Sequence, residues 1–360
     1  MFIIKKILYI INILVALCLL LTYLPYHVDW FDKISLLAYA YPFALVLNLC
    51  FIVLWLIISP KRHILLSCIV IALHFSFVFR LFNFSKQETK DKEDITILTY
   101  NVNEFRHNTL EGSAVQKDNI DSILAFIHRT DPDIICLQDY TSNTSDKKGV
   151  HYRLTKAMKY RYYYFYNKEK SNFIRDCAIY SKYHIANAGS ILPEHERNYS
   201  LIYVDIPYKE KMFRVYNFHL ISYKLGPEEK SSYSQIMHGN IQDKEGGKNI
   251  LKKLVLADGQ KEEQIKEILP KIENSEIPYI ITGDFNSIPF SKVYKLMTEN
   301  LADAFVHKGK GIGRTYNGVF PAYRIDYILY KKESFRAKNY SSPNVDFSDH
   351  YPVLTTFAVN

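Results

Sequence analysis

Apolar residues are distributed unevenly along the chain. The N-terminal region contains three almost uncharged apolar runs, at residues 7–24, 36–58 and 64–82. Each run approaches the roughly 20 residues that a helix needs to cross a hydrocarbon core about 30 Å thick. We therefore expect residues 1–83 to form a bundle of about three transmembrane helices.

The first run has an alternative interpretation. Lys5 and Lys6 precede it, as basic residues precede the apolar region of a secretory signal peptide. No cleavage site of small residues follows, however, and two more apolar runs come next. Three spans are therefore preferred to a cleaved leader.

The positions of Lys and Arg predict the orientation of these spans. Two lysines precede the first run, and Lys61 and Arg62 lie between the second and third runs, whereas the 25–35 connection has one lysine beside two aspartates. The positive-inside rule then places the N-terminus in the cytoplasm. Residues after about 84 are expected outside the cytoplasmic (inner) membrane, although basic residues just after the third run weigh against this orientation.

Beyond the third run the pattern changes to short apolar segments rich in β-branched and aromatic residues, which is typical of strands. A polar stretch at 84–94 is expected to be a linker, and 119–129 and 262–269 have the period of amphipathic helices. The predicted strands are 95–100, 134–137, 162–166, 177–180, 201–206, 213–218, 279–282, 325–330 and 353–358. Many strands with few helices predict a two-sheet α/β sandwich over residues 95–360, with helices on its outer faces.

The segment 221–258 does not follow this rhythm. It contains two stretches, 225–230 and 243–248, whose glycines and charged residues are typical of loops. The segment is also longer than an ordinary connection. We expect either an insertion that covers a substrate or a mobile loop.

Several predicted strands end in Asn, Asp or His. If these strands lie in two facing sheets, their ends meet at one rim and their polar side chains share one crevice. Any one of these residues alone is also compatible with a turn or a surface pair, so the argument rests on their recurrence. The candidate residues are Asn101, Asp139, His219, Asp284, Asn286, Asp326, Asp349 and His350.

Carboxylates and amides without sulfur are the ligands of hard cations. Such a set suits Mg²⁺ or Mn²⁺, which keep several waters and bind substrate phosphate oxygens. The histidines add groups for proton transfer or phosphate contact. Together they indicate metal-assisted hydrolysis of a phosphate ester.

Charge and cysteine content limit the alternatives. The net charge of +8 is shared evenly between the first 83 residues and the rest, which is too mild and too scattered for a strong nucleic-acid surface. Cys136 and Cys177 lie within apolar strand-like runs, where buried thiols are usual; a disulfide between them is the alternative. No zinc-binding pattern is present in the sequence.

The ordered motifs resemble those of the endonuclease/exonuclease/phosphatase superfamily, whose members share a deoxyribonuclease I-like fold. The resemblance covers about residues 95–358, and its most specific parts are Gly-Asp-Phe-Asn at 283–286 and Ser-Asp-His-Tyr-Pro-Val at 348–353. The supporting motifs are Thr-Tyr-Asn-Val (99–102), Leu-Gln-Asp (137–139), Ala-Ile-Tyr-Ser-Lys (178–182), Phe-His-Leu (218–220) and Arg-Ile-Asp-Tyr-Ile (324–328).

The resemblance implies a metal site and a phosphate site. Asp139 falls at the family's metal-ligating acid, and Asp349 would help to hold the metal. Asn101 lies beside Asp139 and would contact the metal or a phosphate oxygen. His219 would bind the phosphate or assist the leaving group.

The remaining residues are implied to act on water and phosphate. Asp284 would orient or deprotonate the attacking water, and Asn286 would position that water and the phosphate. His350, held in its tautomer by Asp326, would contact the scissile phosphate or transfer a proton.

Three positions depart from the family pattern. The family usually has Glu where this chain has Asp139, and many members have Asp at the position of Asn103. A glycine often precedes the Ala-Ile motif, where Asp176 and Cys177 stand here. The first two changes predict weaker metal binding.

The resemblance and the apolar region together imply a membrane-anchored, Mg²⁺-dependent phosphodiesterase or phosphatase. Membrane integration favours a lipid headgroup as substrate. An extracytoplasmic nuclease of the same superfamily is the alternative within this class, and a catalytically silent module that binds a phosphorylated ligand is the alternative outside it. No protein partner is implied.

Overall fold

The computed structural model describes residues 2–27, 32–58, 61–105, 113–163, 172–191, 200–223, 226, 232, 244–317 and 323–360. The chain forms two compact units. The first unit comprises Met1–Leu81, Lys224–Glu262 and Ser287–Leu296. The second comprises Phe82–Tyr223, Glu263–Asn286 and Met297–Asn360.

The first unit contains the apolar N-terminal helices. Two helical stretches, Phe2–His27 and Ile34–Ile57, are long and apolar enough to cross a membrane. Large apolar side chains such as Leu14 and Val46 are 60% and 55% exposed on them, which suits a lipid environment better than water. The elements are α1 (Phe2–Leu21), α2 (Leu24–His27), a 3₁₀ helix (Asp32–Ala40) and α3 (Tyr41–Ile57).

The third apolar run is bent. Helix α4 (Ile64–Leu73) and helix α5 (Phe75–Leu81) are inclined by 69° to each other, as in a broken span or a re-entrant loop. The break lies at His74, whose Nδ1 donates to the Val70 carbonyl over 2.8 Å while its backbone N–H turns to Ile71. The ring thus takes the carbonyl that a continuing helix would use. The described residues therefore contain two helices that are long and apolar enough to cross a membrane, or three if the bent pair counts as one.

A buried polar contact joins three of these helices. The Asn12 side chain on α1 donates to Ser67 on α4 over 2.8 Å and accepts from the Trp55 indole on α3 over 3.0 Å. All three residues are fully buried. Hydrogen bonds between helices of this kind fix their register where apolar contacts alone are not specific.

A later segment completes the first unit. The ring of Phe290 lies 4.3 Å from that of Tyr41 and 5.5 Å from that of Phe77. The Pro289 carbonyl accepts a hydrogen bond from Arg80 over 3.1 Å. Residues 287–296, which directly follow Asn286 in the chain, therefore belong with the N-terminal helices.

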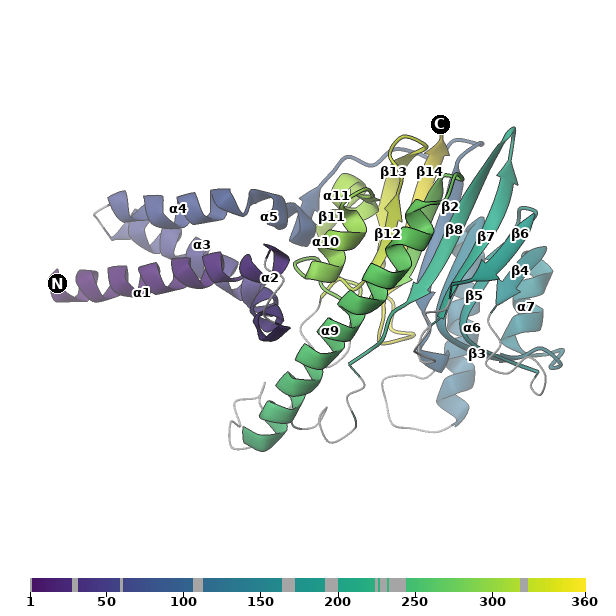
Figure 1. Ribbon diagram of the computed structural model, residues 1–360, viewed down its shortest axis with the longest axis horizontal. Coiled ribbons are helices and arrows are strands. Elements are labelled where there is room, and N and C mark those ends of the chain that lie inside the picture. The colour runs from purple at the N-terminus through teal and green to yellow at the C-terminus, as the bar shows by residue number, and fades with distance from the viewer. Residues whose placement is uncertain are drawn as a thin grey trace. The chain divides into compact units, whose positions relative to one another are not determined.

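The second unit is built on two six-stranded sheets, and Figure 1 shows their strands. The first sheet has the order β13 (Phe335–Ser341), β14 (Val353–Val359), β2 (Ile95–Asn101), β3 (Ile134–Asn143), β5 (Phe173–Ser181), β4 (Tyr160–Tyr163). The second has the order β10 (Ala302–Asp303), β12 (Asp326–Tyr330), β9 (Tyr279–Asp284), β8 (Lys211–His219), β7 (Ser200–Tyr208), β6 (Asn187–Ser190). A small third sheet pairs β1 (Phe82–Phe84) with β11 (Lys310–Ile312).

The two large sheets share one hydrophobic core. Ile97 and Cys136 from the first sheet belong to the same buried cluster as Val215 and Ile280 from the second. A second cluster lies on the other face of the first sheet, where Tyr100 packs with side chains of α6 (Ser113–Thr130) and α7 (Val150–Ala157). The predicted α/β sandwich is confirmed.

Most of the predicted strands are present and several are longer than predicted. Among the described residues, five strands were not predicted, namely β1, β6, β10, β11 and β13, and neither were the helices α7, α10 (Lys292–Thr298) and α11 (Ala304–Lys308). The predicted strand at 162–166 appears as β4, and its last residues lie outside the described ones. These elements are short and their apolar periods are weak, so their packing partners decide their structure.

The prediction of a loop at 243–248 is wrong. Helix α9 runs from Lys244 to Glu273. Ile250, Leu254 and Ala257 are buried on one face of it, and this packing outweighs the low helix propensity of the two glycines at its start. Most of the remaining residues of 221–258 lie outside the described ones.

The polar stretch at 84–94 is held in place by contacts within the second unit. Glu88 accepts from Lys308 over 2.6 Å, and Asp94 accepts from the buried Lys338 over 2.7 Å. Lys90 pairs with Asp133 over 2.7 Å. The part of 84–94 nearest the sheets is therefore fixed by ion pairs.

Gly283 provides a sharp test of the β8–β9 pairing. Its φ is 132°, and a Cβ there would lie 2.0 Å from the Phe218 carbonyl oxygen. We expect Gly283→Ala to lower the free energy of unfolding by about 3 kcal/mol or more, because backbone strain and overlap add. The readout is the melting temperature of the detergent-solubilised protein.

The matched control is Gly259→Ala. Gly259 lies inside helix α9, and nothing lies within 4 Å of the position of its Cβ. This change is expected to raise stability by up to about 1 kcal/mol. Equal melting temperatures for both variants would contradict the close approach at Gly283.

Candidate functional site

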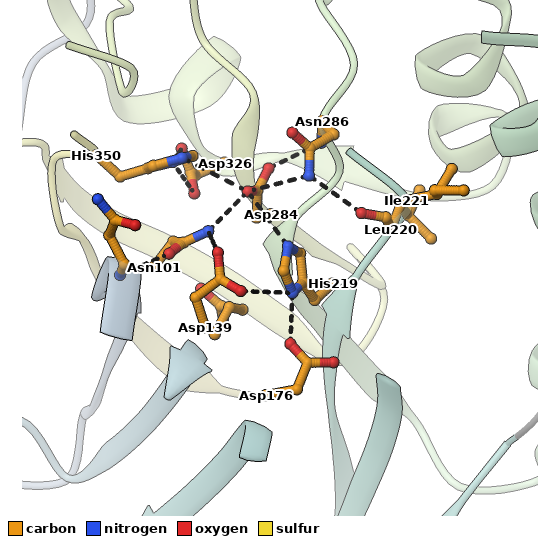
Figure 2. A network of polar contacts seen from close by, with 12 residues as sticks. Asn101, Asp139, Asp176, His219, Leu220, Ile221, Asp284, Asn286, Asp326 and His350 are labelled. Carbon is orange, nitrogen blue, oxygen red and sulfur yellow. Dashed lines mark hydrogen bonds and ion pairs between the residues drawn. The ribbon is translucent and has the colours of Figure 1, made fainter. Parts of the chain in front are cut away.

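Asp284 lies at the centre of the polar cluster in Figure 2. It ends strand β9 and is only 1% exposed. Its Oδ1 accepts from the backbone N–H of Asn286 over 2.8 Å, and its Oδ2 accepts from the side chains of Asn101 and Asn286 over 3.0 and 3.2 Å. These three bonds fix the carboxylate in one orientation.

Asn101 links Asp284 to Asp139. Its Nδ2 also lies 3.2 Å from Asp139 Oδ2, and its Oδ1 accepts from the backbone N–H of Asn103 over 3.0 Å. The second bond sets the orientation of the amide, because only its oxygen accepts hydrogen bonds. The amide nitrogen of Asn101 therefore faces the two carboxylates.

A β-bulge aims Asp139 into the site. The register between β3 and β5 shifts between Leu137 and Tyr140, and Asp139 has a φ of 45°. Such a bulge turns a side chain away from the regular alternation of the strand. The side chain of Asp139 remains 43% exposed, so its carboxylate has room for water.

Gln138 points the other way, into the interior. Its amide donates to Thr99 over 2.9 Å and to Asn217 of strand β8 over 2.6 Å. Since β3 and β8 belong to different sheets, this buried contact joins the two sheets below the site. Gln138 thus has a structural role.

Two histidines flank Asp284 in the same way. His350 Nδ1 lies 3.0 Å from Asp326 and its Nε2 lies 3.7 Å from Asp284 Oδ2. His219 Nδ1 lies 2.5 Å from Asp176 and its Nε2 lies 3.9 Å from the same Asp284 oxygen. Each ring is held by one aspartate and directs its other nitrogen toward Asp284 (Figure 2).

The buried charges influence one another strongly. Burial raises the pKa of Asp284 to about 6, against the opposing effect of His350. Burial alone would lower the pKa of His350, but Asp326 and Asp284 outweigh it and raise that pKa to about 10. The pKa of His219 also lies well above its usual value, because Asp139 and Asp176 outweigh burial. Both rings are therefore stabilised as proton donors.

Two groups of described residues have the composition of a cation site. The ligand atoms of Asp139, Asp176 and His219 lie within 4.8 Å of one another, and so do those of a second group, Asp284, Asp326 and His350. The first group is half-buried and the second is buried. A hard cation that keeps waters fits better at the open Asp139 carboxylate.

The structure brings together most of the residues predicted from the sequence. Asn101, Asp139, His219, Asp284, Asn286, Asp326 and His350 are joined by the contacts above. Asp349 is half-buried and belongs to neither of the two acidic groups among the described residues. It acts on the site through its charge, which helps to raise the pKa of His350.

Asp176 is the functional candidate that sequence reasoning did not identify. It contacts His219 and has a φ of 77°. The sequence offered one indication of its role: Asp176 stands where the endonuclease/exonuclease/phosphatase superfamily often has glycine. A residue that replaces glycine at a left-handed backbone position, and adds a charge, is a reason to look for a partner.

Profiles of known families match two parts of the chain. Residues 98–350 match the profile described as the endonuclease/exonuclease/phosphatase family. Residues 5–81 match a profile described only as a domain of unknown function. No curated protein sequence matches the chain.

Solved structures share the fold at low identity. The human nocturnin catalytic domain with bound sulfate has a TM-score of 0.51 at 18% identity, covering 76% of this chain and 97% of that one. A family member from Bacteroides vulgatus has a TM-score of 0.50 at 18% identity, with coverages of 75% and 100%. Humanised D. rerio TDP2 has a TM-score of 0.50 at 14% identity, with coverages of 74% and 100%.

Asp139 gives the first test of the cation site. We expect Asp139→Ala to weaken Mn²⁺ binding by about tenfold or more, since even indirect changes at metal sites cost this much. Asp139→Glu is expected to have a smaller effect, because it keeps a carboxylate. Electron paramagnetic resonance of free Mn²⁺ in a titration of the full chain measures both.

The control for this titration is Asp146→Ala, at an exposed aspartate. It removes the same charge from another loop and should leave Mn²⁺ binding unchanged. If Asp139→Ala and Asp146→Ala give the same binding curve, Asp139 is not a ligand.

Proposed function

The chain belongs to the endonuclease/exonuclease/phosphatase family, and from this premise we propose that it is a membrane-anchored, Mg²⁺-dependent hydrolase of phosphate esters. The observation that supports the proposal best is the position of Asp284. It is a buried carboxylate, fixed by two asparagines and flanked by two histidines that each carry their own aspartate. A reaction in which water attacks phosphorus requires these groups.

In the proposed reaction Asp284 orients the water and accepts its proton as the oxygen attacks phosphorus. Asn286 positions the water and the phosphate. The ester bond to the leaving oxygen breaks, and that oxygen takes the bonding electron pair. Its proton comes from one of the two imidazolium groups, His219 or His350, while the other donates to a phosphate oxygen.

Asp139 and Asp349 are proposed to hold the cation. When bound, Mg²⁺ or Mn²⁺ supplies positive charge that offsets the charge on the phosphate oxygens. Asn101 is assigned a phosphate contact and the alignment of the carboxylates, because its amide nitrogen faces Asp139 and Asp284. An amide nitrogen does not bind Mg²⁺.

A lipid headgroup is the proposed substrate class. The chain contains two helices that are long and apolar enough to cross a membrane, or three with the bent pair, and anchoring there favours a substrate in the same bilayer. Its basic residues are scattered, whereas a nuclease groove has basic and aromatic stripes that follow a backbone. The catalytic region is proposed to lie on the extracytoplasmic side, as the positive-inside rule predicts.

Asp284→Asn tests the catalytic role. The amide keeps the shape but cannot accept a proton, so kcat for phosphate ester hydrolysis should fall by about 10²-fold or more. The assay uses the full chain in detergent with Mg²⁺, and Asp146→Asn serves as the control for loss of a remote charge. Wild-type turnover in Asp284→Asn would favour a silent module that binds a phosphorylated ligand.

A second experiment separates the substrate classes. Purified full chain with Mg²⁺ is offered phospholipid vesicles in one assay and plasmid DNA in another, each beside Asp284→Asn to exclude contaminating enzymes. We expect release of a lipid headgroup and intact DNA. DNA cleavage with unchanged lipid would contradict the lipid proposal and support the nuclease alternative.

A further inference from the structure

Asp176 lies in a backbone conformation that disfavours most residues with a side chain. It belongs to strand β5 and faces Tyr140 of β3 beside the bulge. Its φ of 77° lies in the left-handed region, where glycine is the most favourable residue. An aspartate there costs on the order of 1 kcal/mol relative to glycine. The carboxylate is thus kept at a position where the backbone conformation favours glycine.

This carboxylate is the nearest acidic partner of His219. Its Oδ1 lies 2.5 Å from His219 Nδ1, whereas Asp139 Oδ1 lies 3.7 Å from the same nitrogen. Only the first distance is that of a hydrogen bond. The Asp139 carboxylate is also the more exposed of the two, at 43% against 23%, so it can bind another group while Asp176 keeps the ring.

The hydrogen bond between Asp176 and His219 determines which nitrogen of the ring faces Asp284. With Nδ1–H donating to Asp176, Nε2 is the nitrogen on the side of Asp284, 3.9 Å from its Oδ2. The Asp326–His350 pair has the same arrangement, with Nε2 3.7 Å from that oxygen. An acid that hydrogen-bonds one imidazole nitrogen sets the tautomer and the orientation of the ring.

We infer that Asp176 is the positioning residue of His219. It acts through the ring and touches neither the attacking water nor the phosphate: its carboxylate holds Nδ1–H so that Nε2 faces the phosphate or the leaving oxygen. The inference rests on the proposed function, because it assigns a task to one of the two histidines of that site.

Asp176→Gly is the sharpest test, because glycine suits the backbone at this position. We expect kcat to fall by about 10- to 100-fold, without a lower melting temperature. The Mg²⁺ concentration for half-maximal activity should stay unchanged, which separates a positioning role from metal ligation. Asp176→Asn should retain part of the activity, because its side-chain oxygen still accepts from Nδ1–H.

A double-mutant cycle checks that the effect passes through the histidine. In a His219→Ala background, Asp176→Gly should change kcat by less than about twofold, since the group that it positions is absent. Asp131→Gly is the matched control: Asp131 also has a left-handed backbone, with φ 44°, and its side chain is 79% exposed. This variant should keep the wild-type kcat.

The outcomes are distinct. A wild-type chain without Mg²⁺-dependent ester hydrolysis would overturn the proposed function itself. An active wild type with an equally active Asp176→Gly would overturn the inference alone. A raised Mg²⁺ requirement with normal kcat at saturation would make Asp176 a ligand, and a lower melting temperature in both Asp176 variants would make it structural; each result contradicts positioning.

Discussion

The parallel pairing of β2 with β3 and of β8 with β9 determines where the site forms. Parallel strands end at the same edge of a sheet, so Asn101 comes beside Gln138 in one sheet and His219 beside Asp284 in the other. The hydrogen bond between Asn101 and Asp284 then joins the two edges over 3.0 Å. Because each sheet contributes one partner, this contact forms only when both sheets pack correctly. The close approach of Gly283 to Phe218 belongs to the β8–β9 pairing within the second sheet.

Asp284 is a buried charged group, and its neighbours compensate for its lost hydration. A carboxylate with 1% exposure loses most of its hydration, and such a group is stable only when hydrogen bonds and opposite charge replace the water. Asn101 and Asn286 supply the first, and the two imidazoles supply the second. The rings need their own counter-charges, which Asp176 and Asp326 provide. The contacts that stabilise the buried carboxylate therefore also hold two imidazole rings beside it.

The sequence was sufficient for features that depend on local pattern. The apolar runs predicted the positions of most strands. The Asp and His residues that follow these runs predicted most residues of the candidate site. Asp176 was missed because its importance comes from a bulge and a left-handed φ, which no local pattern reveals. The start of α9 was missed because the burial of Ile250 and Leu254 is not evident from the glycines and charges around them. The bend at His74 was missed because a ring nitrogen takes a backbone carbonyl. In each case a contact that the residue pattern does not reveal outweighs local propensity.

The chain passes between its two units several times. Residues 287–296 belong to the unit of the apolar helices and follow Asn286 without an intervening residue. Arg80 and Phe77 hold that segment through Pro289 and Phe290. The stretch at 84–94 is itself fixed by Lys308 and Lys338. The backbone that carries Asn286 therefore continues directly into the unit of the apolar helices.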